Sequence, residues 1–245
     1  MSFMEATLVS YPPVSNARRT TRLATALFFF ICVPLSVLDQ FYVPRQVFVL
    51  RDPVATANNL LANEFIFRIS ILSHLAGVLV FFMMGLLFYR IFRPVDKHLA
   101  RVMIIPLLAV IPVTFVFEVF NYTALMVLKG EIHSVMEVRQ QQDVAYFLLR
   151  MLRYGSGGVG LGKLLFGLYL IPFGMLTIRS GFAPRIIGIL AIIGGAGYLA
   201  DCCLSVLMQR ADYLAARWFV WISALGYMAA LLWFLIKGTS DPKIK

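Results

Sequence analysis

Six long apolar runs restrict this chain to one class of fold. Each run is close to or longer than the roughly 20 residues that an α-helix needs to cross the hydrocarbon core of a bilayer. We expect six spans, at residues 23–43, 64–90, 102–128, 146–178, 186–207 and 215–236. Hydrophobic residues make up 60% of the chain and charged residues 14%, against roughly 25% charged residues in soluble proteins. The sequence therefore predicts an all-α, polytopic membrane protein built as a six-transmembrane-helix bundle.

The basic residues predict the domain limits and the orientation of the bundle. Residues 1–22 and 237–245 are expected to be cytoplasmic tails that flank a single membrane domain at 23–236. With the N-terminus inside, the inner segments hold over half of the 22 basic residues and few acids, as the positive-inside rule requires. These short segments account for the formal charge of +10, so we expect no nucleic acid partner. The first apolar run lacks a small-residue cleavage site, which favours a retained helix over a cleaved signal peptide.

Two polar segments are expected on the outer side. The stretch "RDPVATANNLLANE" (51–64) opens with a turn signal and continues with alternating apolar residues. It predicts a short amphipathic helix on the outer surface, ahead of the second span. In "KGEIHSVMEVRQQQD" (129–143), His133 and Glu137 stand four residues apart. That spacing suits a surface metal site, although a solvated helix face is commoner.

The stretch "GGVGLGKLL" (157–165) matches a phosphate-binding loop at every position but the last. A true loop of this kind lies between a β-strand and a helix and ends in a Ser or Thr that binds magnesium. Here a leucine stands at that position and the flanking sequence is helical and apolar, so we exclude a nucleotide site. Gly158 and Gly162 instead form a G-x-x-x-G pattern, which favours close helix packing in lipid. Ala191 and Gly195 offer a matching small face on the fifth span.

Ionisable residues inside the apolar runs form a predicted polar layer. A charge within a span is destabilising unless it is paired or wetted, so each such residue is a candidate functional residue. Counting the helical rise from the inner end of each span places five of them at a similar height of about 22–24 Å. They are Asp39, His74, Glu118, Lys163 and Asp201. Arg68 and Arg153 lie just above the layer.

The layer has three open interpretations. It can be a salt-bridge network that only stabilises the bundle, a cavity open to the outer face that binds a ligand, or a metal site with one histidine and three carboxylates. We take all seven residues as candidate ligand contacts and leave metal and cofactor content undetermined. Lys163 and Asp201 should face each other, because the fourth and fifth spans are joined by a short inner turn and pack as antiparallel neighbours.

The inner turn "RSGFAPR" (179–185) combines two arginines with residues that prevent the helices from continuing. Gly181 and Pro184 favour a tight turn. We expect this turn at the level of the lipid head groups, with Arg179 and Arg185 in contact with the phosphates of membrane lipids.

Several segments resemble bacterial membrane proteins grouped as domain of unknown function 4386. They are "FRPVDKHLA" (92–100), "GLYLIPFGMLTIRSGFAPRIIGILAIIGGAGYLAD" (167–201) and "ATANNLLANEFIFRIS" (55–70), and the resemblance extends from about residue 20 to 236. The residues on matching positions are Arg68, Glu118, Arg179, Gly181, Pro184, Arg185, Gly188, Tyr198 and Asp201. The stretch "RYGSGGVGLGK" (153–163) departs from the family pattern. The resemblance implies a multi-pass protein of the bacterial inner membrane with six helices, and it implies no function.

Three hypotheses for function follow. The first is a protein that binds a small ligand, an ion or a lipid head group in the polar layer, for transport or sensing. The second is a structural or accessory subunit of a larger membrane complex, with other membrane subunits or further copies of itself as partners. The third is an intramembrane enzyme that acts on a lipid or a quinone. Ser70, Ser73 and His74 lie close together on one predicted helix, but no G-x-S-x-G context supports a nucleophile, so no catalytic residue is predicted.

Overall fold

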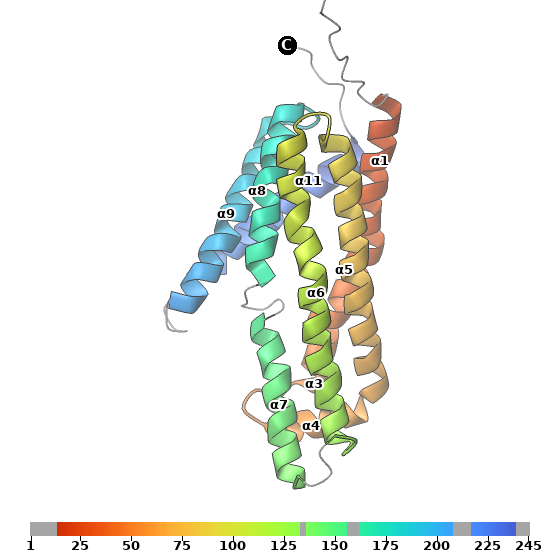
Figure 1. The fold of residues 1–245 in the computed structure, drawn as a ribbon, viewed down its shortest axis with the longest axis vertical. Helices are drawn as coiled ribbons and strands as arrows, with labels where there is room; N and C mark the ends of the chain where they lie inside the picture. Colours follow the sequence, from red (N-terminus) through yellow and green to blue (C-terminus); the bar gives the residue numbers. More distant parts are fainter. Residues whose placement is uncertain (1–13, 133–135, 156–161, 208–216, 239–245) are drawn as a thin grey trace, which may run out of the picture.

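The computed structural model describes residues 14–132, 136–155, 162–207 and 217–238, and these ranges consist of helices and their connections (Figure 1). The first span is composed of α1 (Val14–Leu27), η1 (Phe28–Cys32), α2 (Val33–Val37), η2 (Leu38–Tyr42) and α3 (Val43–Val47). The later helices are α4 (Pro53–Ala62), α5 (Glu64–Phe92), α6 (Lys97–Leu128), α7 (Val138–Gly155), α8 (Gly162–Ser180), α9 (Arg185–Leu207) and α11 (Arg217–Ile236). The predicted all-α class is confirmed for the described part of the chain.

Four described helices are long and apolar enough to cross a membrane. They are Arg18–Val47, Glu64–Phe92, Lys97–Leu128 and Arg185–Leu204, and they correspond to the first, second, third and fifth predicted spans. The described apolar stretches of α8 and α11 are shorter, at Leu164–Ser180 and Tyr227–Ile236. The structure thus supports a membrane protein, and the described residues account for four of the six expected spans.

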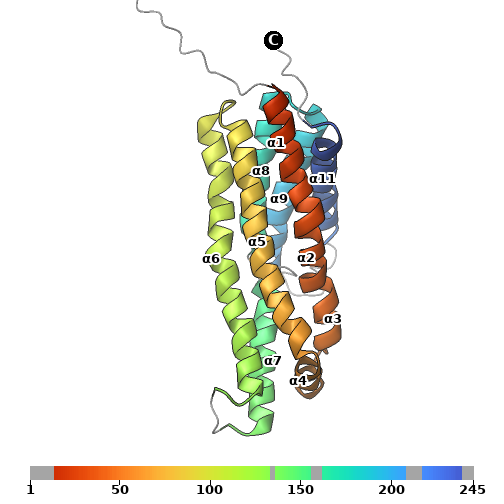
Figure 2. The same cartoon turned by 90° about the vertical axis from the view of Figure 1, so that its right-hand side faces the viewer.

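Two prolines shape the first span. Pro34 and Pro44 have no amide hydrogen, and each ring displaces the carbonyl one turn back, which bends or breaks an ordinary α-helix. The chain instead widens into π-helical turns, η1 and η2, just before the two prolines, and the helix continues along α5 (Figure 2). A π-turn contains one more residue than an α-turn, so it changes which side chains face a neighbour, and such turns are frequent at functional sites. Asp39 and Gln40 lie within η2.

The predicted amphipathic helix at 51–64 forms as α4. Asp52 is its N-cap, because the Oδ1 atom accepts a hydrogen bond from the amide of Ala55 at 2.9 Å, and Pro53 occupies the first helical position, where no amide hydrogen is needed. The backbone amide of Arg51 donates to the hydroxyl of Tyr146 at 2.8 Å. This bond and the packing of α4 against α7 hold α4 across the end of the bundle (Figure 1).

The described residues of the predicted fourth span, 146–178, lie in two helices. They are divided between α7, which ends at Gly155, and α8, which begins at Gly162, and residues 156–161 lie outside the described residues. α7 exposes polar side chains such as Arg139 and packs against α4 and α6.

α8 and α9 approach each other backbone to backbone at two glycine pairs. A Cβ atom on Gly174 would lie 2.5 Å from the carbonyl oxygen of Gly188, and one on Gly167 would lie 2.8 Å from that of Gly195. Both pairs repeat after seven residues on each helix, in antiparallel register, and small residues at such contacts let helices pack closely in lipid. The small face predicted on the fifth span is confirmed at Gly195. Its partners lie further along α8 than the predicted G-x-x-x-G, whose Gly158 is outside the described residues.

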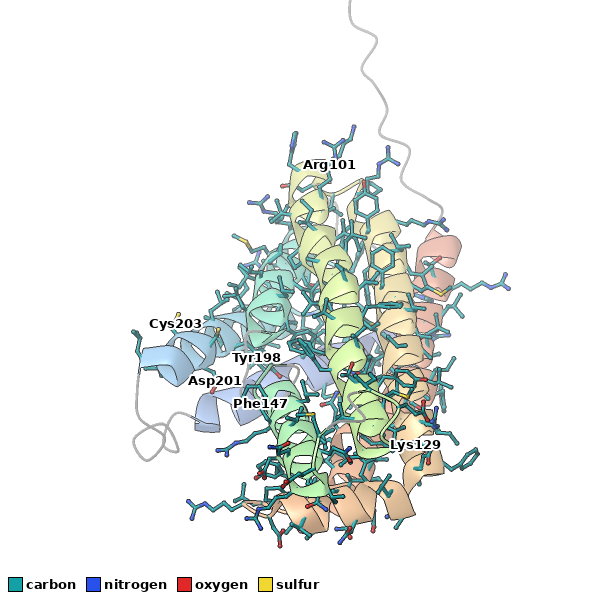
Figure 3. The ribbon with its side chains drawn as sticks, turned by 60° about the horizontal axis from the view of Figure 1, so that its bottom comes forward. Arg101, Lys129, Phe147, Tyr198, Asp201 and Cys203 are labelled. Carbon is teal, nitrogen blue, oxygen red and sulfur yellow. The ribbon has the colours of Figure 1, made fainter. Side chains whose placement is uncertain are left out.

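The predicted tight turn between the fourth and fifth spans is confirmed. Gly181 adopts a left-handed φ of +64°, and α9 begins at Arg185. This turn lies at the same end of the bundle as the turn between α5 and α6 (Figure 1). Arg101 marks this end and Lys129 the opposite end (Figure 3).

Two hydrophobic cores divide the bundle along its length. The larger core contains Phe88, Phe173 and Phe234 and joins the first span to α5, α6, α8, α9 and α11. The smaller core contains Phe67 and Leu125 and joins α3, α4, α5, α6 and α7. Residues 76–80 of α5 and 108–123 of α6 belong to neither core. Thr114 and Glu118 of the candidate site lie in this gap on α6, and His74 lies at its edge on α5, next to Leu75 of the smaller core.

Candidate functional site

A histidine meets two carboxylates from other helices between the two cores. The Nδ1 atom of His74 on α5 lies 2.5 Å from Oε1 of Glu118 on α6 and 3.8 Å from Oδ2 of Asp39 in η2. The side chains of His74, Glu118 and Asp39 are 19%, 4% and 15% exposed. The sequence predicted these residues at one height, and the structure brings them together. We call them the histidine–carboxylate cluster.

Glu118 is the most enclosed member of this cluster, and both of its carboxylate oxygens are engaged. Asn121, one turn further along α6, donates from Nδ2 to Oε2 at 2.9 Å, while Oε1 faces His74. An ionised carboxylate only accepts hydrogen bonds, so Nδ1 of His74 is the donor in this contact when Glu118 is ionised. The imidazole is therefore held in one orientation by α6.

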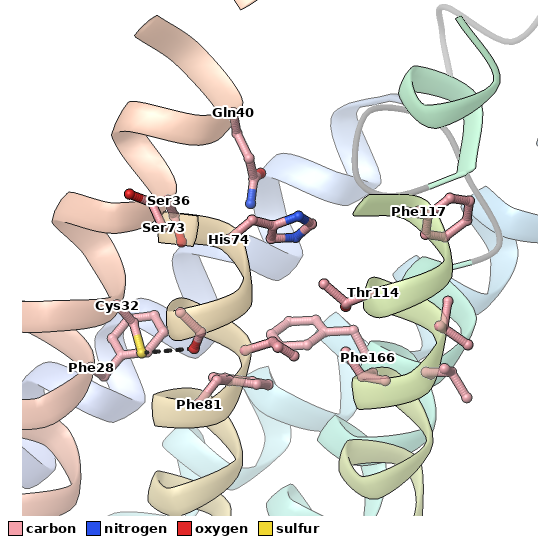
Figure 4. A pocket seen from close by; sticks show the side chains of 15 residues that line it. Phe28, Cys32, Ser36, Gln40, Ser73, His74, Phe81, Thr114, Phe117 and Phe166 are labelled. Carbon is pink, nitrogen blue, oxygen red and sulfur yellow. Dashed lines mark hydrogen bonds between the residues drawn. The ribbon is translucent and has the colours of Figure 1, made fainter. Parts of the chain in front are cut away.

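His74 also lines a cavity of about 240 Å³ between the first span, α5, α6 and α8 (Figure 4). The first span, α5, α6 and α8 each contribute one phenylalanine to its lining, namely Phe28, Phe81, Phe117 and Phe166. The polar part of the lining consists of Cys32, Ser36, Gln40, Ser73, His74 and Thr114. Gln40 is exposed, so the cavity reaches the surface there. A closed cavity of roughly 150 Å³ is enough to hold benzene, and this one therefore has room for a small organic molecule.

The two π-turns position the first span at the site. Cys32 lies in η1 and donates from Sγ to the carbonyl oxygen of Gly77 at 3.6 Å (Figure 4). Gly77 has no side chain, and the nearest atom to a Cβ built there is Cβ of Leu35 at 3.9 Å, so the first span can lie close to α5. One π-turn further on, η2 carries Asp39 toward His74.

An aromatic layer lies behind the cavity wall. The ring of Phe166 packs edge-to-face on Tyr227, with 5.3 Å between ring centroids, and Phe81 packs on Tyr169 at 6.0 Å. Tyr169 and Tyr227 are almost completely buried, and among the described residues their hydroxyls have no hydrogen-bond partner of normal geometry. Buried hydroxyls of this kind are typical of places where water or a ligand supplies the missing bond.

Arg68, another candidate from the predicted layer, belongs to a separate charged group. Its Nη2 atom lies 2.7 Å from Oε1 of Glu64, one turn earlier on α5. Lys129, just beyond the end of α6, approaches the same oxygen at 3.2 Å, and the guanidinium carbon of Arg68 lies 5.8 Å from the ring centroid of Tyr122. Arg68 thus joins α5 to α6 through their ends and is not among the described residues that line the cavity.

Asp201, also predicted for the layer, is 1% exposed on α9 near Tyr198 (Figure 3). It is not among the described residues that line the cavity, but the Tyr198 ring packs on Phe166 at 5.2 Å and so links this part of α9 to the cavity wall. Lys163 is the second residue of α8, and its side chain, like that of Arg153, lies outside the described residues. The expected pair of Lys163 with Asp201 and the ligand contact of Arg153 stay predictions.

The two arginines of the α8–α9 turn differ in their surroundings. The guanidinium of Arg179 pairs with Oδ2 of Asp96 from the α5–α6 turn, so in this structure Arg179 joins two turns of the protein. Oδ1 of Asp96 accepts from the amide of Leu99 at 2.9 Å and caps α6. This bond and the charge of Arg179 hold the pKa of Asp96 below its ordinary value. Arg185 is exposed, and its contact with lipid phosphates stays a prediction.

Comparison with known proteins identifies the family of the chain. The family model described as Domain of unknown function (DUF4386) matches residues 23–238, which cover the whole predicted membrane domain and most of the chain. The chain belongs to the DUF4386 family. Neither the curated proteins nor the solved structures contain a match to it.

The described residues of this DUF4386 protein contain no group of three or more His, Cys, Asp and Glu side chains arranged to hold a metal ion. In the histidine–carboxylate cluster, both carboxylates approach the same nitrogen of His74, where a metal would have to replace the hydrogen. His133 of the outer segment lies outside the described residues.

Sequence reasoning missed most of the cavity lining of this DUF4386 protein. Asp39, His74 and Glu118 were found because ionisable residues stand out in apolar runs. Thr114 and Phe166 carry no such signal, because hydroxyl and aromatic residues are common packing residues in membrane helices. The prolines of the first span were the one available signal for an irregular helix beside the site.

Proposed function

We propose that this DUF4386 protein is a multi-pass protein of the bacterial inner membrane that binds a small ligand in the cavity beside the histidine–carboxylate cluster. One observation carries the proposal: a half-buried histidine that is hydrogen-bonded to Glu118 and lies close to Asp39 also lines a cavity. A salt-bridge layer that only stabilised the bundle would need no cavity next to it. The coincidence of the two features supports a binding site.

The incomplete pairing of the cluster supports the same conclusion. Ionisable groups at membrane depth must be paired or must face a water-filled space. Glu118 has partners at both oxygens, but Asp39 lies 3.8 Å from His74, beyond the distance of a direct hydrogen bond. A polar ligand or water in the cavity would complete the surroundings of Asp39 and His74.

We further propose that binding serves transport or sensing. With both termini assigned to the cytoplasm on the basis of the basic inner segments, the end of the cavity at Gln40 would face the outer side. A solute or lipid head group from the outer side would reach it near Gln40, where the cavity meets the surface.

The test is to fill the cavity without changing its charge. Thr114 extends from α6 toward the cavity and is 5% exposed (Figure 4). Thr114→Phe should occupy the space with a ring, whereas Thr114→Val keeps the shape of the side chain and serves as the matched control. Ser36→Phe fills the same cavity from the first span and replaces Thr114→Phe if that variant does not fold.

The measurement is mass spectrometry of the molecules that co-purify with each protein in lipid nanodiscs. We expect one small molecule or lipid to be retained by the wild type and by Thr114→Val and to be lost from the filled variant. If all of the folded proteins retain the same molecules in the same amounts, the cavity is not a ligand site and the proposal is refuted.

A further inference from the structure

We infer that the ligand of this cavity is a small organic cation with an apolar body, such as a hydrophobic amine or a quaternary ammonium compound. The inference rests on the proposed function and adds the chemical class of the ligand. Two independent features carry it, namely the sign of the charge at the cluster and the aromatic lining of the cavity.

The charged cluster next to the cavity has more carboxylates than basic groups. His74 lines the cavity, and Asp39 and Glu118 lie beside the histidine without being among the described lining residues. Asp39 and Glu118 each carry a negative charge when ionised, and His74 supplies at most one positive charge. Arg68, the basic residue that precedes His74 on α5, is engaged with Glu64 instead. When both carboxylates are ionised, the cluster therefore keeps a net negative charge even with the histidine protonated. A cation in the cavity would compensate this charge, while an anion would be repelled.

The lining suits an organic cation better than a hydrated metal ion. Phe28, Phe81, Phe117 and Phe166 line the cavity from four directions. The negative face of an aromatic ring attracts a cation within about 6 Å of its centroid, and aromatic cages are a common solution for quaternary ammonium groups. The remaining apolar lining, Val78, Val110, Val113 and Leu165, offers no replacement for the water shell of an inorganic ion.

Other ligand classes fit one of these features and not the other. A neutral quinone would pack on the aromatic rings but would leave the carboxylates uncompensated. A fatty acid or a phosphate would be repelled by the two carboxylates beside His74. An organic cation is the class that satisfies the charge and the rings together.

The experiment uses three probes of similar shape that differ in charge. Phenyltrimethylammonium is the cation, tert-butylbenzene has carbon in place of the charged nitrogen, and benzenesulfonate is the anion. Binding to the purified full-length protein in nanodiscs of zwitterionic lipid is measured by calorimetry. We expect phenyltrimethylammonium to bind and the other two probes to bind at least about tenfold more weakly.

Carboxylate-to-amide variants locate the charge that is responsible. Glu118→Gln and Asp39→Asn should each weaken binding of the cation by about tenfold or more, because each removes one negative charge beside the cavity. Glu64→Gln is the matched control, because it makes the same chemical change in a carboxylate that is engaged with Arg68 and Lys129. Its affinity for the cation should equal that of the wild type.

The outcomes separate this inference from the proposed function. Equal or tighter binding of the neutral or the anionic probe would overturn the cation class. So would cation binding that appears only in Lys163→Met, because the lysine would then be the native counter-charge. If no probe binds but Thr114→Phe still removes a co-purifying molecule, the ligand site stands and the cation class falls. If neither effect is seen, both are wrong.

Discussion

The glycine contacts between α8 and α9 predict that replacing Gly174 by alanine destabilises the protein. The added Cβ would lie 2.5 Å from the carbonyl oxygen of Gly188, 2.8 Å from Cγ1 of Ile192 and 3.0 Å from the backbone nitrogen of Ile192. Two of these three atoms belong to the backbone, so a change of rotamer cannot relieve the clash and the helices must separate. Overpacking of a well-packed contact costs about 1–3 kcal/mol. We expect the upper part of this range, because separation also weakens the Gly167–Gly195 contact on the same face.

Gly77→Ala is the matched control for this substitution. It makes the same chemical change in a helix, but the nearest atom to the new Cβ is Cβ of Leu35 at 3.9 Å, an ordinary van der Waals contact. Alanine is the better helix former by about 0.5–1 kcal/mol, so this variant should be as stable as the wild type or more stable. Thermal unfolding in detergent micelles, followed by tryptophan fluorescence, measures both. The packing argument is refuted if Gly174→Ala unfolds at the same temperature as Gly77→Ala.

Charged residues elsewhere give three further predictions. Asp96→Ala should lower the unfolding temperature more than Asp96→Asn, because asparagine keeps the cap of α6 and loses only an exposed ion pair. The pKa of Asp96 is lowered in the folded protein. The stability that its carboxylate contributes is therefore complete above the pKa of the unfolded chain and is lost as pH falls through the folded pKa. A difference in unfolding temperature between wild type and Asp96→Ala that persists in strong acid would contradict this. Glu118→Gln should lower the free energy of unfolding by about 1–3 kcal/mol, and by more than Asp39→Asn does. Glu118 is the closer partner of the histidine and the less exposed carboxylate. Equal losses of unfolding free energy in the two variants would count against the cluster as described. Cysteines placed at Lys97 and Glu137 should react with an impermeant thiol reagent from opposite sides of the membrane, and labelling from one side would exclude the proposed topology.

The apolar runs predicted most of the helices because a segment in lipid must satisfy its backbone internally and turn apolar side chains outward. Average hydrophobicity does not show where such a helix stops. The run at 146–178 contains the later part of α7, an amphipathic helix with exposed polar side chains. Its apolar residues adjoin those of α8 in the sequence, so average hydrophobicity does not separate the two helices. The small face of the fifth span was visible at Gly195, but which glycines of the fourth span meet it depends on the register of two helices, and one sequence does not contain that information.

For the candidate site, the sequence likewise predicts the position of a residue along its helix but not the direction in which its side chain points around the helix. Counting residues gives the relative height of a side chain, and Asp39, His74 and Glu118, which were expected at one level, do meet. Each residue also turns the helix by about 100°, and each π-turn adds a further shift that the count ignores. The direction around the helix explains why Arg68, on the same helix as the histidine, pairs with Glu64 and lies near the ring of Tyr122 instead of joining the cluster.

Lys163 and Asp201 remain the predicted ion pair between the fourth and fifth spans, and the glycine register makes that prediction sharper. Because Gly167 lies opposite Gly195 on an antiparallel helix, Lys163 is level with residue 199, about 3 Å along the axis from Asp201. The aspartate is 1% exposed, so Lys163→Met should leave a buried carboxylate without this partner, at a cost of about 3–5 kcal/mol. Adding Asp201→Asn should recover much of the loss, and the two single variants with the double variant form a double-mutant cycle measured by thermal unfolding. A coupling energy near zero in that cycle would show that the two side chains do not interact, and the lysine would then have to find its partner elsewhere in the bundle.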